Sequence, residues 1–301
     1  MGRTTLTEVL DLLGRIARAD RIEDVWRPVA DHFAPMGFAR LNYGLTRFRM
    51  EASIGDPEDA LFLSTSETEY SQLYVRDGFF KRTPVYRWLM KNTGLTTWRW
   101  VHDHFTAGLL TEEEEEAVRV NTRFGIFAGL AISFPETPRT KGALGLTADP
   151  GMDHDDVDDI LASRRAEIEA VAHMMHLRII SLPANYVRRS LTPRQREVLE
   201  WVADGKTTQD IGILMTISAA MVEKHLRLAR EALNVETTAQ AVAKGTLLNL
   251  IFTRDGPEVA QGARQATVAL VPPHPAAKAR LTASPTGKDS PTYARRRQTA
   301  F

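Results

Sequence analysis

The chain has 301 residues, of which 43% are hydrophobic and 25% are charged, and its formal net charge at pH 7 is zero. This length favours two domains, and the composition is that of a soluble globular protein. No apolar run approaches the roughly 20 residues of a membrane-spanning helix, which excludes a membrane protein. The lack of cysteine excludes a disulfide scaffold, a thiolate zinc site and a cysteine nucleophile, and we expect a cytoplasmic protein.

Residues 1–180 mix helical and strand patterns without a regular β-α alternation. Apolar residues recur at helical spacing from Leu6 to Ala17 and from Val25 to Phe33. A long helix is expected from Asp153 to about Ile180, with acidic residues in its first turn. Strand-like runs lie between these helices, at residues 38–45, 127–134 and 143–147. The order predicts an α+β sandwich rather than a doubly wound sheet.

Residues 181–190 are expected to form a linker, because Pro183 breaks the long helix. Residues 191–252 then contain helical patterns only. The first helix starts at Thr192, which predicts a capping box with Gln195 three residues later. Gly205 suits the left-handed position that follows the end of that helix.

Two short helices separated by a tight turn follow, and they are expected to begin at the capping residues Thr207 and Ser218. The second helix buries apolar residues on one face and exposes charged ones on the other: Glu223, Lys224, Arg227 and Arg230. This pattern indicates a helix-turn-helix that enters a DNA major groove. The alternative from the residues alone is that Glu223 and Arg227 form a surface ion pair four residues apart.

A fourth helix is expected from about Thr238 to Phe252. Its stripe of small residues, Ala241 and Gly245 followed by Leu248, is a candidate surface for pairing two copies of the chain. Residues 253–301 are expected to be a largely disordered basic tail. From Arg254 onward eight basic residues outnumber three acids, and large apolar residues are almost absent after Pro272.

The helical segment resembles the LuxR-type DNA-binding domain. The resemblance rests on Leu191–Thr207, Ser218, Val222, His225-Leu226 and Ala239–Lys244. It implies an all-α four-helix domain whose partner is a double-stranded DNA operator, bound by a homodimer. The positions expected to contact DNA are Lys206, Thr207, Ser218, Glu223, Lys224, Arg227 and Arg230. The chain departs from the family at Gln195, which is usually glutamate, and at Glu223, where neutral or basic residues are commoner.

The N-terminal segment resembles the autoinducer-binding domain of quorum-sensing regulators over roughly residues 5–178. The resemblance rests on Tyr70-xxx-Tyr74, Arg82–Val85, Trp98 and Phe124–Ser133. It implies an α-β-α sandwich, with the sheet expected to be antiparallel, that holds an N-acyl-homoserine lactone between the sheet and one helical layer. No cofactor is implied. The expected ligand-binding positions are Tyr70, Tyr74, Thr83, Trp98, Gly129, Ala131 and Gly145.

Several of these positions depart from the family pattern. Tyr70 stands in place of the tryptophan that donates to the lactone carbonyl, and Thr83 in place of the aspartate that accepts the ligand's amide proton. A neutral threonine oxygen loses the charge-assisted bond of a carboxylate. Ala131 and Gly145 make the expected pocket less polar than usual. The ligand is therefore expected to be an acyl-homoserine lactone or another apolar signal.

Together these features predict a ligand-responsive transcriptional regulator without enzymatic activity. One alternative is a ligand-independent LuxR-type regulator in which the pocket residues are structural. Another is an enzyme that acts on signal lactones. His102, Asp103 and His104 place two histidines for a metal on an expected strand, but a metallo-lactonase requires a longer histidine-rich run.

Overall fold

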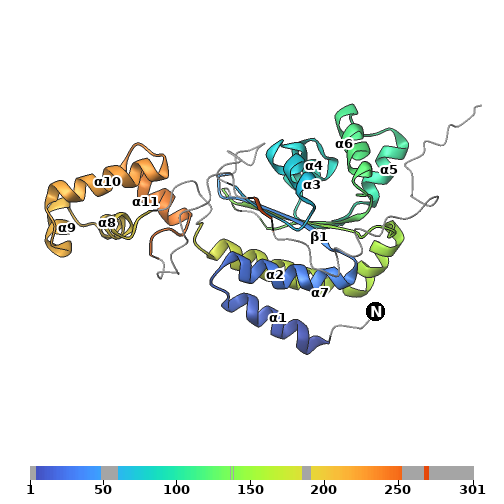
Figure 1. The fold of residues 1–301 in the computed structure, drawn as a ribbon, viewed down its shortest axis with the longest axis horizontal. Helices are drawn as coiled ribbons and strands as arrows, with labels where there is room; N and C mark the ends of the chain where they lie inside the picture. Colours follow the sequence, from blue (N-terminus) through green and yellow to red (C-terminus); the bar gives the residue numbers. More distant parts are fainter. Residues whose placement is uncertain are drawn as a thin grey trace, which may run out of the picture. The chain divides into compact units, whose positions relative to one another are not determined.

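The computed structural model describes residues 5–48, 60–135, 137, 139–184 and 191–252, together with the backbone of 268–270. Contacts divide the chain into two compact units. The first holds the described residues up to Ile179, except Ala60, together with 268–270, and the second holds Ala60 and the described residues from Ile180 to 252. The N-terminal unit combines a sheet with helices on both of its faces, and the C-terminal unit is helical (Figure 1). Residues 185–190 lie outside the described residues, so the linker remains a prediction.

The N-terminal unit begins with two amphipathic helices, α1 (Leu6–Arg18) and α2 (Ile22–Phe33), and the short turn η1 (Ala34–Met36). Its strands are β1 (Arg40–Thr46), β2 (Leu61–Ser64), β3 (Gly94–Thr97), β4 (Gly129–Ser133) and β5 (Lys141–Thr147). Between β2 and β3 lie α3 (Thr68–Ser71), η3 (Gln72–Arg76), η4 (Phe79–Arg82) and α4 (Pro84–Lys91). The remaining helices are α5 (Arg99–Ala107), α6 (Glu112–Arg123) and α7 (His154–Ser181).

The sheet has the strand order β3-β4-β5-β1-β2-β6. Every neighbouring pair is antiparallel except β2 with β6 (Val268–Leu270), which are parallel. The expected strands at 38–45, 127–134 and 143–147 are confirmed as β1, β4 and β5. Strand β6 falls within the expected tail, and the rest of that tail lies outside the described residues, so its disorder remains a prediction.

Helices cover both faces of this sheet, which confirms the α-β-α sandwich. Helices α2 and α7 lie under one face, with α1 outside them, and α3 to α6 lie over the other (Figure 1). The face toward α2 and α7 forms the apolar core of this unit. Its side chains are at most 1% exposed: Leu41, Tyr43, Leu45, Leu61, Leu63, Leu130, Ile132, Leu144 and Leu146.

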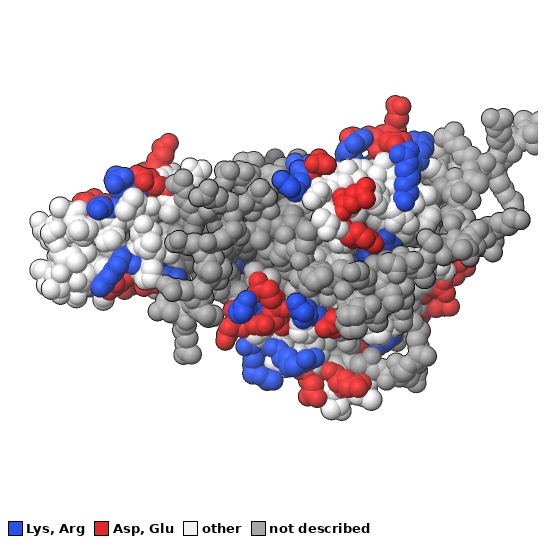
Figure 2. All heavy atoms as spheres, viewed as in Figure 1, with Lys and Arg blue, Asp and Glu red and all other residues white. Residues whose placement is uncertain are grey.

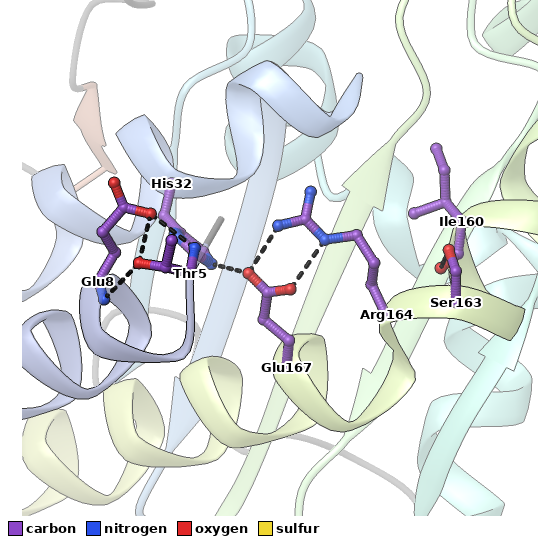
Figure 3. A network of polar contacts seen from close by, with 7 residues as sticks. All are labelled: Thr5, Glu8, His32, Ile160, Ser163, Arg164 and Glu167. Atoms are coloured by element: carbon purple, nitrogen blue, oxygen red, sulfur yellow. Dashed lines mark hydrogen bonds and ion pairs between the residues drawn. The ribbon is translucent and has the colours of Figure 1, made fainter. Parts of the chain in front are cut away.

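Helix α7 is kinked at Arg164, whose φ of −132° lies outside the helical range. The hydroxyl of Ser163 donates to the carbonyl oxygens of Asp159 and Ile160, a bonding pattern that bends helices. The guanidinium of Arg164 donates to both carboxylate oxygens of Glu167, at 2.8 and 2.7 Å, and Nε2 of His32 lies 3.1 Å from the same carboxylate (Figure 3). These contacts hold the kink against α2.

The C-terminal unit contains α8 (Pro193–Ala203), α9 (Thr208–Met215), α10 (Ala219–Leu233) and α11 (Thr238–Leu247). The expected helix starts are confirmed. Thr192 and Thr207 form capping boxes with Gln195 and Asp210, and Ser218 accepts a hydrogen bond from the backbone of α10. Gly205 has the expected positive φ, +78°.

The fourth helix is shorter than the sequence pattern predicts. It ends at Leu247, and Asn249 and Phe252 have positive φ angles, so the chain turns instead of continuing the helix. The expectation for its small-residue stripe is also wrong. Ala241 and Leu248 are fully buried within the unit, and Gly245 packs against Ile251. This stripe is not available for pairing two copies of the chain.

Candidate ligand-binding face and nucleic-acid interface

One row of residues crosses the sheet on the face covered by α3 to α6. Its members are successive cross-strand partners, from β3 to β2: Thr96, Ala131, Gly145, Asn42 and Ser64. Directly opposed residues share a face of a sheet. The structure therefore brings together Ala131 and Gly145, two of the predicted ligand positions, and it adds Asn42 between Gly145 and Ser64.

The two faces of the central strands are covered to different extents. Along β1 and β5, residues facing α2 and α7 are buried, whereas the middle residues of the opposite face remain partly exposed. These partly exposed residues are small or polar: Asn42, Gly44, Ala143 and Gly145. The overlying helices therefore leave the middle of this face incompletely covered.

Trp98 lies over this face at the N-terminal end of α5. A Cβ atom at Gly129 would lie 2.9 Å from Cζ3 of its indole, and one at Gly145 would lie 3.9 Å from Cζ2. Gly129 thus makes room for the ring, whereas a Cβ at Gly145 would be in ordinary van der Waals contact with it. Trp98 also packs against two groups of apolar residues, one around Tyr70 and one around Val101. Its indole Nε1 is buried without a hydrogen-bond partner among the described residues.

Tyr70 and Tyr74 form an aromatic wall next to Trp98. Their rings are stacked with centroids 5.4 Å apart, and Phe124 packs against Tyr70 at 5.2 Å. The hydroxyl of Tyr70 donates to Oδ1 of Asn121, at 3.0 Å. The donor expected to meet a lactone carbonyl therefore has an internal acceptor on α6.

Both tyrosine hydroxyls are protonated at neutral pH, and burial moves their pKa values further above neutrality. Burial raises the pKa of Tyr70 well above its usual value and raises the pKa of Tyr74 to about 12, although a hydrogen bond with Thr83 partly opposes the second shift. A phenol in this state can donate a hydrogen bond to a neutral acceptor. The aromatic wall is therefore uncharged and suits an uncharged ligand.

Thr83, which the sequence predicts as a ligand-binding residue, has a structural role in this fold. It is the N-cap of α4: its hydroxyl donates to the carbonyl oxygen of Phe80, at 2.8 Å, and accepts from the backbone N–H of Tyr86, at 3.3 Å. Thr83 as a whole is 3% exposed. The hydroxyl is thus already engaged on both its hydrogen and its oxygen.

Arg40 also shapes this site, although its sequence pattern does not predict it. Arg40 is 1% exposed, and its guanidinium donates to the carbonyl oxygens of Phe124 and Gly125, both at 2.9 Å. These carbonyls follow the C-terminal end of α6, where a cation is favourable. Arg40 therefore fixes the segment that carries Phe124 against the aromatic wall. A strand pattern alone does not reveal this, because an arginine at the start of a strand usually faces solvent.

In the C-terminal unit, α9 and α10 form the expected helix-turn-helix. The turn passes through Thr216 in the left-handed conformation, with φ +56°. Gly212 allows this turn to approach α9, because a Cβ there would lie 2.9 Å from the carbonyl oxygen of Ile217. Helix α10 buries Val222, Leu226, Ala229 and Leu233.

The ion pair between Glu223 and Arg227, which was the alternative to the DNA-contact interpretation, is not present. Arg227 pairs instead with Glu231, at 2.5 Å, and both side chains are about half exposed. Glu223 accepts a hydrogen bond from Thr208 at 2.9 Å, which links α10 to α9. An exposed pair of this kind contributes a few tenths of a kcal/mol, so the guanidinium of Arg227 can exchange its partner at little cost.

The other expected DNA contacts differ in their surroundings. Lys206 and Lys224 are exposed, whereas Arg230 is half-buried and donates to Thr238 on α11, at 3.0 Å. Thr207 and Ser218 are helix caps, so their hydroxyls accept backbone N–H groups. Figure 2 shows acidic and basic side chains next to one another on the visible face of this unit.

The pair His102 and His104 lies on helix α5, not on a strand. Residues two apart on a helix point in different directions, so this is a correction to the expected geometry. The described part of the chain holds no group of three or more potential metal-ligating histidine or acidic side chains. Among the helices within that part, none is both long and apolar enough to span a membrane.

Comparisons with known proteins match both units. The model of the autoinducer binding domain matches residues 21–179, and that of the luxR family of bacterial regulatory proteins matches residues 189–244. The quorum sensing-dependent transcriptional regulator RpaR of Rhodopseudomonas palustris is 30% identical over 190 residues, which cover 61% of this chain and 72% of RpaR. The transcriptional activator AnoR of Acinetobacter nosocomialis is 21% identical over 80% of this chain and 98% of its own.

Among solved structures, Escherichia coli SdiA aligns with a TM-score of 0.49 and 17% identity, over 82% of this chain and 99% of SdiA. The family assignment rests on the two family models and on RpaR, not on this alignment. The chain belongs to the LuxR family of bacterial regulatory proteins that carry an autoinducer binding domain.

Proposed function

We propose that this protein is a quorum-sensing transcriptional regulator that binds an N-acyl-homoserine lactone, or a related apolar acyl signal, and responds by changing its binding to a DNA operator. The observation that carries the ligand proposal is the incompletely covered sheet face, with small residues at its centre and Trp98 over Gly129 and Gly145. An acyl chain needs apolar walls with few polar groups, which this face supplies.

The polar end of the ligand is assigned to the aromatic wall. Tyr74 supplies a protonated hydroxyl, which would exchange its hydrogen bond with Thr83 for one to the ligand. Trp98 supplies an apolar surface, and its indole N–H has no acceptor among the described residues. Tyr70 shapes the wall through its stack with Tyr74. Gly129, Ala131 and Gly145 form the floor, and Thr83 maintains the start of α4.

The DNA proposal rests on α10. Its exposed side carries Lys224 and Arg227 while its opposite side is buried, which is the arrangement of a recognition helix in a major groove. Glu223 is placed to accept from a cytosine amine or to orient Thr208. We further propose that the protein acts in the cytoplasm as a homodimer, because palindromic operators require two-fold symmetry.

A second candidate is a ligand-independent regulator. It is favoured by one observation: the hydroxyls of Tyr70 and Thr83 already have hydrogen-bond partners within the protein. A third candidate, a lactone-processing enzyme, is not favoured by any observation, and we propose that the chain has no enzymatic activity.

Incubation of the purified protein with a panel of N-acyl-homoserine lactones separates these candidates. After removal of free ligand, a receptor retains one intact lactone per chain. A ligand-independent regulator retains none, and an enzyme returns the ring-opened or deacylated product. Mass spectrometry of the bound and free fractions distinguishes the three results.

A further inference from the structure

Asn42 occupies an unusual position for its residue type. It lies in β1, which has neighbouring strands on both sides, and asparagine is depleted in strands. Its cross-strand partner Gly145 carries no side chain that could contact Asn42 on the ligand face. The residue is only partly buried, unlike its neighbours Leu41 and Tyr43 on the opposite face. A residue that breaks a local rule at a central position often serves function.

Serine side chains hold the amide of Asn42 in one orientation. The hydroxyl of Ser64 donates to Oδ1 at 2.7 Å, and Nδ2 donates to the hydroxyl of Ser66 at 3.3 Å. Ser64 is itself fixed, because it accepts from the backbone N–H of Ser66 at 3.1 Å and contacts the hydroxyl of Ser71 at 3.1 Å. The amide is therefore positioned before any ligand arrives.

This network leaves part of the amide's hydrogen-bonding capacity unused. A carboxamide accepts two hydrogen bonds through its oxygen and donates two through its nitrogen. One bond on each atom is taken up by the serines. One acceptor position on Oδ1 and one donor position on Nδ2 therefore remain, and the acceptor position can take the N–H of a secondary amide.

Thr83 does not compete for this task. Its hydroxyl hydrogen goes to the carbonyl oxygen of Phe80, and its oxygen accepts from Tyr86. We propose that Asn42 is the specificity-determining residue for the ligand amide: Oδ1 accepts the amide N–H and Nδ2 donates to a ligand carbonyl. This inference rests on the proposed function, in which an acyl ligand occupies this face.

The test compares the binding of two probes that differ only in an amide N–H, which an ester oxygen replaces in the second probe. One is N-octanoyl-homoserine lactone, and the other is the ester α-octanoyloxy-γ-butyrolactone, in which oxygen replaces the amide N–H. We expect the full-length protein to bind the amide about tenfold or more tightly than the ester by calorimetric titration, because the ester cannot fill the acceptor position of Oδ1 that Ser64 leaves open and instead places an oxygen against it. Asn42→Leu should reduce this preference to about twofold or less.

Two further variants separate recognition from folding. Asn42→Asp keeps an acceptor at Oδ1 and makes it charged, so the preference for the amide should exceed that of the unmodified protein. Ser64→Ala removes the hydroxyl that orients Asn42, so the preference should fall part of the way. Thermal unfolding of each variant checks that it is folded. If Asn42→Leu does not fold, the amide preferences of Asn42→Asp and Ser64→Ala test whether Asn42 recognises the ligand amide.

The contrary results distinguish a failure of the role proposed for Asn42 from a failure of the proposed function. An unmodified protein that binds both probes equally, a folded Asn42→Leu that keeps the tenfold preference, or an Asn42→Asp that leaves it unchanged overturns the role of Asn42. An unmodified protein that binds neither probe contradicts both this role and the proposal that the sheet face receives an acyl lactone.

Discussion

Trp98 packs directly onto Gly129: a Cβ atom at Gly129 would lie 2.9 Å from Cζ3 of the indole and 2.3 Å from the carbonyl oxygen of Leu146. The backbone N–H of Trp98 also donates to the carbonyl oxygen of Gly129, at 2.9 Å. The tryptophan and the glycine are thus fixed to each other by both packing and a backbone hydrogen bond, and this contact sets how far the indole stands from the sheet.

The two floor glycines are expected to respond differently to a methyl group. Gly129→Ala should lower the free energy of unfolding by about 1–3 kcal/mol, because the Cβ overlaps with backbone as well as with Trp98. Gly145→Ala should change it by less than about 1 kcal/mol, because its nearest atoms are 3.8 and 3.9 Å away. Urea denaturation measures both. Equal losses in the two variants would contradict the placement of Trp98.

Thr83 is expected to stabilise α4 rather than to bind ligand directly. Thr83→Val keeps the shape but removes the cap, so the free energy of unfolding should fall by about 0.5–2 kcal/mol. Thr83→Ser keeps the hydroxyl as both donor and acceptor and should be close to the unmodified protein in thermal unfolding. If Thr83→Val is as stable as Thr83→Ser, the hydroxyl does not cap the helix.

Arg227 is expected to read DNA bases. Arg227→Ala should weaken binding to a specific operator by about 1–3 kcal/mol and should relax sequence discrimination. Lys224→Ala should weaken binding to all sequences alike and reduce the salt dependence. Fluorescence anisotropy at several salt concentrations measures both effects. Discrimination that survives Arg227→Ala would show that α10 does not read the operator through this residue.

Arg230 is expected to act mainly within the domain. Its hydrogen bond to Thr238 joins α10 to α11, so Arg230→Ala should lower the melting temperature of the protein, whereas Lys224→Ala should not. The two variants remove the same charge, which makes Lys224→Ala the matched control. Unchanged thermal stability in Arg230→Ala would favour a role at the DNA phosphates instead.

The protein is expected to lose stability in mild acid because His176 is buried in its neutral form. His176 stacks on Phe134 with centroids 4.1 Å apart and hydrogen-bonds to Tyr43 at 2.9 Å, and burial lowers its pKa from 6.5 to about 4. The folded state thus favours the neutral ring, so the contribution is full above pH 6.5 and is lost as the pH falls toward 4. We expect a decrease of about 2 kcal/mol in the free energy of unfolding between pH 7 and pH 5.

His176→Gln tests this assignment, because glutamine keeps an acceptor for Tyr43 and does not titrate. Its unfolding free energy should depend less steeply on pH over the same range. Burial also lowers the pKa values of His32 and His154, so part of the acid sensitivity should remain. A pH dependence identical to that of the unmodified protein would assign the effect to those histidines.

The features that could be predicted from the sequence are those that depend on residues close together along the chain. The capping boxes at Thr192 and Thr207 depend on residues three apart, and both are present. The strands rich in apolar residues, β1, β4 and β5, were also recognisable. The short strands β2, β3 and β6 were not, because four or three residues carry too little periodicity.

The site depended on contacts that join distant segments. Asn42 acquires its place from its pairing with Gly145, and Arg40 from carbonyls more than eighty residues away. The pattern of residues in a single sequence does not show which distant segments are paired or hydrogen-bonded. The end of α11 was missed for a related reason: the apolar residues Leu248, Leu250 and Ile251 continue the hydrophobic pattern, but the chain turns so that Ile251 packs on Gly245.

The central claim is that a ligand on the sheet face changes how α10 binds DNA. An operator selected from random duplexes allows its Kd to be measured at fixed salt, with and without each lactone of a series from butanoyl- to tetradecanoyl-homoserine lactone. We predict that at least one retained lactone changes the Kd tenfold or more, in either direction. A lactone that is retained stoichiometrically while the Kd stays the same across the series would contradict the account.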